Sequence, residues 1–162
     1  MTKSAPSLAD LQAPTGSRFA VVCARWNAIV TDRLLEGAVS TLREADVSGD
    51  RIVVARVPGA FELPVVAARL AKTGRYDAVI CLGAVIKGDT EHDRYINESV
   101  ANALQSIGME TGVPALFGVL TCNTAGQAAD RAGGKDGNKG VEAALAAIEM
   151  TVLLRKLASE GL

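Results

Sequence analysis

The chain has 162 residues, of which 49% are hydrophobic, 22% charged and 4% aromatic, and its formal net charge is -1. The length suggests one domain over residues 1–162, and so small a charge gives no sign of a nucleic-acid or anionic-membrane surface. No apolar stretch approaches the roughly 20 residues of a membrane helix, and the polar residues at the start lack the apolar core that we expect of a signal peptide. We therefore expect a cytoplasmic protein with an ordinary apolar core.

The first segments predict an arm, a strand and a helix. Residues 1–16 contain two prolines, so we expect a flexible arm there or a strand lent to a neighbouring subunit. The apolar run Phe19–Ala24 predicts the first strand, and Asn27 is a suitable cap for the helix that follows. The apolar stripe of that helix comprises Ile29, Val30, Leu34, Ala38 and Leu42. The only tryptophan, Trp26, lies where the strand ends, and its position alone is equally consistent with simple packing and with stacking on a flat ligand.

The second strand and helix are predicted over Ile52–Val57 and from Leu63 to Lys72. A proline at position 64 suits the first turn of a helix, because the missing N–H has no helical partner there. Glu62, at the start of this helix, either compensates the helix dipole or points a carboxylate at a ligand.

The central stretch of the chain is the nearly unbroken apolar run Ala78–Ile86, which predicts a strand buried on both faces of a parallel sheet. A polar loop, residues 87–90, follows it, and helical spacing of apolar residues runs from Glu91 to about Gly112. The only histidine, His92, lies at this junction. Because parallel α/β sheets bind ligands at the carboxyl ends of their strands, the histidine lies where such a fold keeps its chemistry.

The last third of the chain predicts a fourth strand over Ala115–Leu120 and a short helix capped by Thr124. A basic, glycine-rich loop follows over residues 131–140. The final helix, Val141–Leu157, is apolar almost all the way round, so it is either sandwiched within the monomer or covered by another subunit.

The order of these elements predicts a flavodoxin-like, three-layer α/β/α sandwich around a four-stranded parallel sheet. We find no internal repeat or linker. Cys23, Cys81 and Cys122 lie within or at the end of apolar runs, so we expect reduced, buried thiols.

Several kinds of site lack their motifs, namely a dinucleotide loop, a Walker loop, a serine elbow and a metal site. A histidine titrates near pH ~6.5 and suits proton transfer, although a lone histidine is as often structural. Arg and Lys in a glycine-rich loop suit a phosphate, although such loops are more often solvated turns. The residues alone therefore indicate a cofactor-free enzyme that acts on a phosphorylated small molecule.

Six motifs in order extend this interpretation. They are Ala24-Arg-Trp-Asn27, Val57-Pro-Gly-Ala-Phe-Glu62, Leu82-Gly-Ala-Val-Ile-Lys-Gly-Asp-Thr-Glu-His92, Phe117-Gly-Val-Leu-Thr121, Gln127-Ala-Ala-Asp-Arg-Ala-Gly133, and Asn138-Lys-Gly140 leading to Glu149-Met150. Over about Arg18–Leu157 the chain resembles the 6,7-dimethyl-8-ribityllumazine synthase family. The resemblance implies condensation of 5-amino-6-(D-ribitylamino)uracil with L-3,4-dihydroxy-2-butanone 4-phosphate, in which an imine forms, phosphate is eliminated and the ring closes. It implies no metal or redox cofactor.

The resemblance also implies roles for individual residues. The resemblance implies that the pyrimidine stacks on Trp26, a position where the family more often has Phe. The neighbouring residue Asn27 is also implied to bind substrate. The ribityl chain of the pyrimidine is expected at Ala60, Phe61 and Glu62, and backbone groups of Ala84, Val85 and Ile86 are expected to line the pyrimidine site. Asp93 departs from the aromatic residue that often follows the histidine, which affects the expected local packing.

The remaining roles concern the phosphate and the proton. Asp89 and Thr90 match positions that meet the butanone phosphate, and His92 matches the proton-transfer residue. Arg131 matches the phosphate clamp, with Lys139 nearby, and Phe117 matches a pocket residue from the adjacent subunit.

The family's sites lie between subunits of a pentamer, and such an interface would explain why the last helix is apolar almost all the way round. The loop Gly133–Gly140 resembles that of members in which twelve pentamers form an icosahedral 60-mer, and a riboflavin synthase is an implied partner. Two alternatives stay open. An archaeal-type riboflavin synthase is disfavoured by the Gly-x-Thr-x-His pattern at residues 88–92, and a non-catalytic flavin- or lumazine-binding shell protein would bind ligand without turnover.

Overall fold

The computed structural model describes residues 11–162 and contains a four-stranded parallel sheet. The strands are β1 (Phe19–Ala24), β2 (Ile52–Val57), β3 (Ala78–Ile86) and β4 (Ala115–Cys122). Their order is β2-β1-β3-β4, and every neighbouring pair is parallel. The bounds predicted for the first three strands are confirmed, and β4 is two residues longer than predicted.

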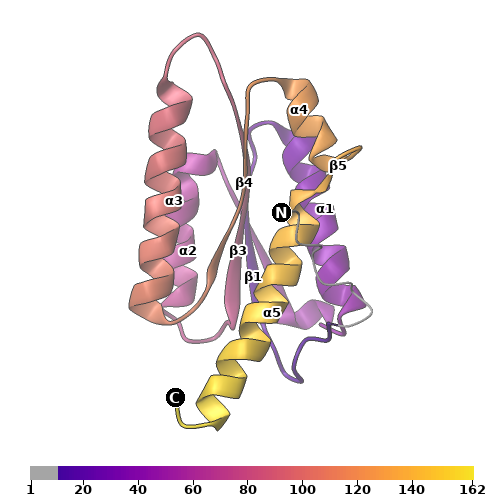
Figure 1. Cartoon of the computed structure of the whole chain (residues 1–162), viewed down its shortest axis with the longest axis vertical. Coiled ribbons are helices and arrows are strands. Elements are labelled where there is room, and N and C mark those ends of the chain that lie inside the picture. The colour runs from indigo at the N-terminus through magenta and orange to yellow at the C-terminus, as the bar shows by residue number, and fades with distance from the viewer. Residues whose placement is uncertain (1–10) are drawn as a thin grey trace.

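Helices cover both faces of the sheet, so the predicted three-layer α/β/α sandwich is confirmed (Figure 1). The helices α1 (Ala28–Glu44) and α5 (Lys139–Ser159) lie on one face, and α2 (Leu63–Ala71) and α3 (His92–Thr111) lie on the other. The short helix α4 (Ala125–Asp130) follows β4, and Thr124 caps it by accepting from the N–H of Gln127 at 3.1 Å, as predicted. Two 3₁₀ helices, η2 (Gly49–Arg51) and η3 (Ala60–Glu62), flank β2.

The strand β3 forms the centre of the core because its apolar run has no polar face. Its residues from Ala78 to Ala84 are buried. Alternate side chains face opposite layers, so that Ile80 packs on the side of α1 and α5 and Val79 on the side of α2 and α3. Each large side chain buried in this way contributes roughly 1.5–3 kcal/mol to folding before entropy is counted.

The first part of the final helix packs within the chain, which agrees with the first of the two predicted alternatives, a helix sandwiched within the monomer. Buried residues such as Ala144 and Ile148 face the layer that α5 shares with α1. Further along, Val152 and Leu153 are exposed, so this part of the helix leaves apolar surface uncovered in the single chain.

Three predictions need correction. The segment 131–140 is a hairpin and not a plain loop, because β5 (Ala132–Gly134) pairs antiparallel with β6 (Gly137–Asn138), and α5 consequently begins at Lys139. Ile29 does not join the buried stripe of α1, since it is 81% exposed in the first turn. Cys122 is only partly buried, because it lies at the end of the edge strand.

The start of the chain can be compared with its prediction only over residues 11–16, and a strand lent to a neighbouring subunit stays a prediction. Residues 11–16 form no strand and contact their own chain, since the N–H of Ala13 donates to the carbonyl of Ala45 at 3.2 Å and Leu11 packs against the core. Residues 1–10 of the predicted arm lie outside the described residues. Within residues 11–162, none of the helices has the length and apolar character to cross a membrane.

Candidate active site

A cavity of about 310 Å³ lies at the carboxyl ends of β1 and β3, between η3 and the start of α3. Nine of the predicted site residues line it, namely Trp26, Asn27, Ala60, Phe61, Ala84, Val85, Ile86, Thr90 and His92. These residues come from four separate segments of the chain. The cavity thus lies at the carboxyl edge of the sheet, where parallel-sheet topology led us to expect a site.

The loop after β1 carries Trp26 to the rim of the cavity. The N–H of Arg25 donates to the carbonyl of Val57 at 2.7 Å, and the N–H of Trp26 donates to that of Pro58 at 3.0 Å. These bonds hold the loop against the segment that follows β2. Trp26 is 63% exposed, so it is available to a ligand in a way that a core side chain is not.

Asn27 joins two strand ends and does not cap α1 with its side chain. Its backbone has φ 60° and ψ 46°, a left-handed conformation that Asn tolerates better than most residues. Its side-chain amide donates to the carbonyl of Ala84 at 2.8 Å. The predicted cap position is thus correct, but the side chain ties the end of β1 to the end of β3 and so shapes the cavity.

The end of β3 presents backbone groups to the cavity. Pairing with β1 stops at Leu82, whereas β3 continues to Ile86. The N–H of Lys87 donates to Cys122 at the end of β4, and backbone groups alternate in direction along a strand. Ala84 and Ile86 therefore present their N–H and C=O groups away from β4, toward the cavity, and Val85 contributes its side chain.

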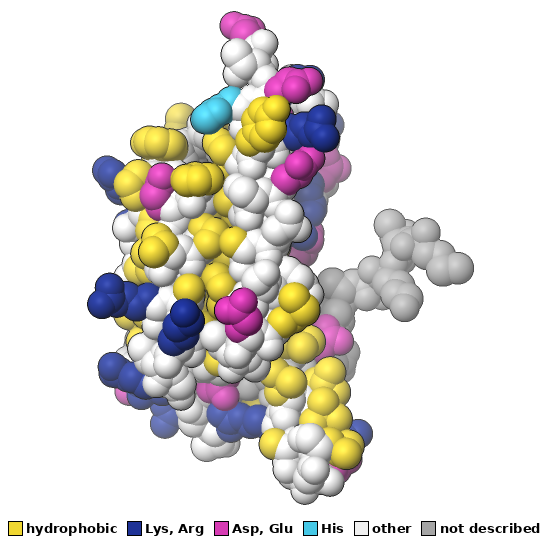
Figure 2. Space-filling view, turned by 90° about the vertical axis from the view of Figure 1, so that its left-hand side faces the viewer, with side chains coloured by type: hydrophobic (Ala, Val, Ile, Leu, Met, Phe, Trp, Pro, Cys, Tyr) yellow, Lys and Arg dark blue, Asp and Glu magenta, His cyan; other side chains and the backbone are white. Residues whose placement is uncertain are grey.

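His92 is the first residue of α3 and is exposed at the cavity wall. Figure 2 views the face of α2 and α3, on which a histidine lies near the upper end beside hydrophobic side chains. Thr90 and Gly88 line the same wall, and a Cβ added to Gly88 would meet no atom within 4 Å, so this loop is open. Asp89 is exposed on the loop but does not line the cavity.

Glu62 also lies outside the cavity lining, next to Phe61, which does line it. Its Oε2 accepts a hydrogen bond from the N–H of Gly59 at 2.9 Å. One carboxylate oxygen of Glu62 therefore accepts a hydrogen bond inside the chain. This contact was part of neither predicted role, compensation of the helix dipole or contact with a ligand.

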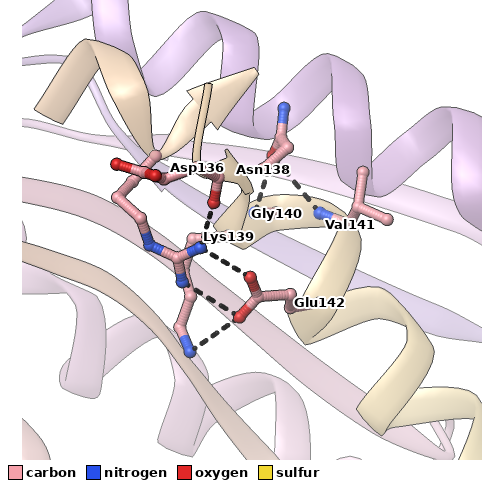
Figure 3. Close-up of polar contacts among 7 residues, drawn as sticks. Asp136, Asn138, Lys139, Gly140, Val141 and Glu142 are labelled. Carbon is pink, nitrogen blue, oxygen red and sulfur yellow. Dashed lines mark hydrogen bonds and ion pairs between the residues drawn. The ribbon is translucent and has the colours of Figure 1, made fainter. Parts of the chain in front are cut away.

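A second group of charged residues gathers around the β5–β6 hairpin and the start of α5 (Figure 3). The guanidinium of Arg131 donates to both carboxylate oxygens of Glu142, at 2.8 and 3.1 Å, and to the carbonyl of Asp136 at 2.6 Å. The ammonium of Lys139 lies 3.4 Å from Glu142. Neither of the two predicted cations lines the cavity.

The electrostatics of this second group follow from the bidentate pair. The hydrogen bonds from Arg131 lower the pKa of Glu142 below its ordinary value, and the same bonds raise the pKa of Arg131. Both side chains stay about one-third exposed, so solvent weakens the pair. Sequence reasoning missed Glu142, whose only signal was its position in the first turn of α5.

Asn138 determines where this charged group lies. Its Oδ1 accepts from the N–H groups of Gly140 and Val141 at 2.8 and 3.3 Å, and its Nδ2 donates to the carbonyl of Arg33 at 3.1 Å. The first contacts cap α5, and the last one attaches the hairpin to α1. The charged group is thereby held beside α1, in the layer that α1 and α5 share.

Phe117 lies in the middle of β4 and is 36% exposed. It is paired in register with Cys81, so it lies well before the carboxyl edge of the sheet. Within a single chain it is not part of the cavity.

No three His, Cys, Asp or Glu side chains within residues 11–162 come together in a way that could hold a metal ion. Burial raises the pKa of Cys23 to about 11 and that of Cys81 to about 12, so neither thiol is a ready nucleophile. Besides the predicted residues, Ala24, Gly88, Asp93 and Ile96 line the cavity. Ile96 could have been found from its place on the apolar stripe of α3.

Comparison with known proteins agrees with this architecture. A family model described as 6,7-dimethyl-8-ribityllumazine synthase matches residues 16–155. A protein of that name from Xylella fastidiosa strain 9a5c is 51% identical over 144 residues, which cover 89% of this chain and 94% of the relative. Proteins of the same name from strains M12 and M23 are 49% identical over the same shares of both chains. The chain therefore belongs to the 6,7-dimethyl-8-ribityllumazine synthase family.

Proposed function

We propose that the cavity is the site where this chain condenses 5-amino-6-(D-ribitylamino)uracil with L-3,4-dihydroxy-2-butanone 4-phosphate to 6,7-dimethyl-8-ribityllumazine in riboflavin biosynthesis. The observation that carries the proposal is that one cavity is lined by an exposed indole, an exposed imidazole and the end of β3, which extends beyond its pairing with β1. Such a set can hold a flat heterocycle and serve proton transfer beside it.

The pyrimidine lies between Trp26 and the end of β3. Its ring stacks on the exposed indole, and its ring N–H and C=O groups pair with backbone groups of Ala84 and Ile86. Asn27 limits how much of the Ala84 carbonyl is free, because that oxygen already accepts from its side chain. The ribityl chain extends along Ala60 and Phe61.

His92 moves the protons that imine formation and phosphate loss require. A positioned proton-transfer group contributes roughly 10²- to 10⁴-fold to a rate. Holding the two substrates in reacting geometry contributes more, on the order of 7–11 kcal/mol. The reaction therefore depends mainly on a pocket that aligns both molecules.

The phosphate lies at the loop of residues 87–91, where Asp89 and Thr90 precede the N-terminus of the long helix α3. Backbone N–H groups and the helix dipole at that end favour an anion. The cations that complete the phosphate site, Arg131 and Lys139, come from a neighbouring subunit together with Phe117. Their exclusion from the cavity of their own chain supports this arrangement.

The chain accordingly assembles through pentamers, and we propose a 60-mer of twelve pentamers that associates with a riboflavin synthase. Apolar side chains left exposed in the single chain, such as Val152 and Leu153, support burial by neighbours. Sedimentation velocity tests the assembly, because a species of pentamer mass alone would contradict the 60-mer. The three unpaired cysteines support a cytoplasmic location.

The direct experiment supplies both substrates to the purified chain and follows lumazine fluorescence and released phosphate. We expect both to rise together. Ligand binding without product would favour the non-catalytic shell protein instead. Product formed only from two lumazine molecules would favour the riboflavin synthase.

A further inference from the structure

The backbone of Gly59 and the indole ring of Trp26 approach each other more closely than a side chain at position 59 would allow. A Cβ built on Gly59 would lie 2.6 Å from Cζ3 and 3.2 Å from Cδ2 of the indole, and nearer still to Cε3. Ordinary carbon contacts are about 3.5–4.0 Å. The ring therefore lies directly on the bare backbone of Gly59.

The conformation of Gly59 does not itself require a glycine. Its φ of -139° and ψ of -177° are extended values that any residue adopts. The residue is also buried. The need for glycine at this position comes from the indole, and a substitution there acts on the ring and not through backbone strain.

Separate hydrogen bonds hold both partners of this contact. The N–H of Gly59 donates to Oε2 of Glu62 at 2.9 Å, and the N–H of Glu62 donates back to the carbonyl of Gly59 at 3.3 Å. The backbone of Trp26 is attached one residue away, through its N–H bond to Pro58. The ring and the surface under it are thus positioned independently of any ligand.

We propose that Gly59 is a positioning residue that sets the plane and depth of the Trp26 ring, and that Glu62 holds Gly59 in place for this purpose. The indole lies on Gly59, and Trp26, which is 63% exposed, also lines the cavity. The contact therefore sets the width of the slot for a flat heterocycle. That the heterocycle is the pyrimidine substrate rests on the proposed function.

The substitution Gly59→Ala tests this proposal. The ring has to move by about 1 Å to recover an ordinary contact with the new methyl group. We expect the KM for the pyrimidine to rise by about 2- to 10-fold, the equivalent of a stacked aromatic pair, with kcat and the KM for the butanone phosphate nearly unchanged. A rise in both KM values by the same factor would overturn the proposal.

Fluorescence gives a readout that does not depend on turnover. Trp26 is the only tryptophan of the chain, so the emission maximum and iodide quenching of the free protein report on this ring alone. Both should change in Gly59→Ala and in Glu62→Ala, but not in Glu62→Gln, which keeps an oxygen that accepts from Gly59. Unchanged emission and quenching in Gly59→Ala would overturn the proposal even if the enzyme is active. If the unmodified chain makes no product, the proposed function fails and this measurement still decides the role of Gly59.

Two matched variants separate this contact from a general effect of an added methyl group. Gly49→Ala lies at the opposite end of β2, where its Cβ would meet only Arg43, at 3.8 Å, so fluorescence and KM should not change. In a Trp26→Phe background the phenyl ring lacks Cε3 and Cζ3, so Gly59→Ala should raise the pyrimidine KM less than it does beside the indole. An equal rise in both backgrounds would contradict the proposal.

Discussion

The heterocycle end and the anion end of the proposed site are built in opposite ways. At the cavity, Trp26 lies on Gly59, backbone groups of β3 stay unpaired by any strand, and His92 is exposed. Around the β5–β6 hairpin, the charge of Arg131 is already matched by Glu142 within the same chain. The cavity is therefore formed before a ligand arrives, whereas the cations around the hairpin are already paired with a carboxylate of their own chain.

This difference follows from the kind of group each end uses. The groups at the cavity are backbone N–H and C=O groups and an indole that lies on a glycine. They have fixed positions and carry no net charge, so they can stay at a cavity wall without a bound ligand. A guanidinium that is partly buried favours a carboxylate partner, because leaving the charge alone costs free energy. Under the proposed function, the anion end becomes competent only when a neighbouring chain brings it to a substrate.

The largest effect is expected at the heterocycle end. His92→Ala should slow turnover by roughly 10²- to 10⁴-fold, because it removes the proton-transfer group, with the KM of both substrates little changed. Steady-state kinetics measures this effect. Thermal unfolding of the variant should match that of the unmodified protein, since His92 is exposed. A normal rate would make the histidine structural and would leave the cavity without a proton carrier.

The next effect separates the two ends. Arg131→Ala should weaken the binding of the butanone phosphate by about 10- to 100-fold, which is the effect of losing a charged hydrogen bond. The affinity for the pyrimidine should stay the same. Lys135→Ala is the matched control, because Lys135 lies in the same hairpin and pairs only with Asp130 on the surface. Equal losses for both substrates would contradict the assignment of Arg131 to the phosphate.

Mixing the two variants tests whether the ends belong to different chains. Co-assembled His92→Ala and Arg131→Ala chains should recover part of the activity at low butanone phosphate, because some interfaces then join an intact His92 to an intact Arg131. No recovery in confirmed mixed oligomers would mean that both groups act within one chain. That outcome would remove the main contrast between the two regions.

The smallest effect concerns the internal pair of the anion end. Glu142→Gln should lower the free energy of unfolding by at most about 1 kcal/mol at pH 7, because the pair is about one-third exposed. The pKa of Glu142 is lower in the folded than in the unfolded chain, so its contribution is full above its ordinary value of 4.5 and is lost as the pH falls through the lowered value. Urea unfolding should therefore show a constant difference from pH 7 to about pH 5.5 that closes in acid. A difference that persists in acid would show that Glu142 acts through packing.

The order of strands and helices was predictable because its signals are local. The apolar run of β3 has no alternation and so indicates burial on both faces, and Pro64 and Thr124 mark helix starts by chemistry that needs no distant partner. The place of the cavity followed from the same reasoning, since the carboxyl ends of parallel strands meet at one edge. Residue roles went further only through the family resemblance.

The sequence by itself therefore determined the sheet, its layers and the edge that holds the cavity, because each follows from periodicity and from residues close together in the chain. Tertiary structure alone decided that Asn27 bonds to Ala84, that Asn138 attaches the hairpin to α1, and that Trp26 rests on Gly59. These contacts join segments far apart in the chain, and no local pattern encodes them. They form only when packed layers bring the segments together, and between Trp26 and Gly59 one methyl group would already be too large.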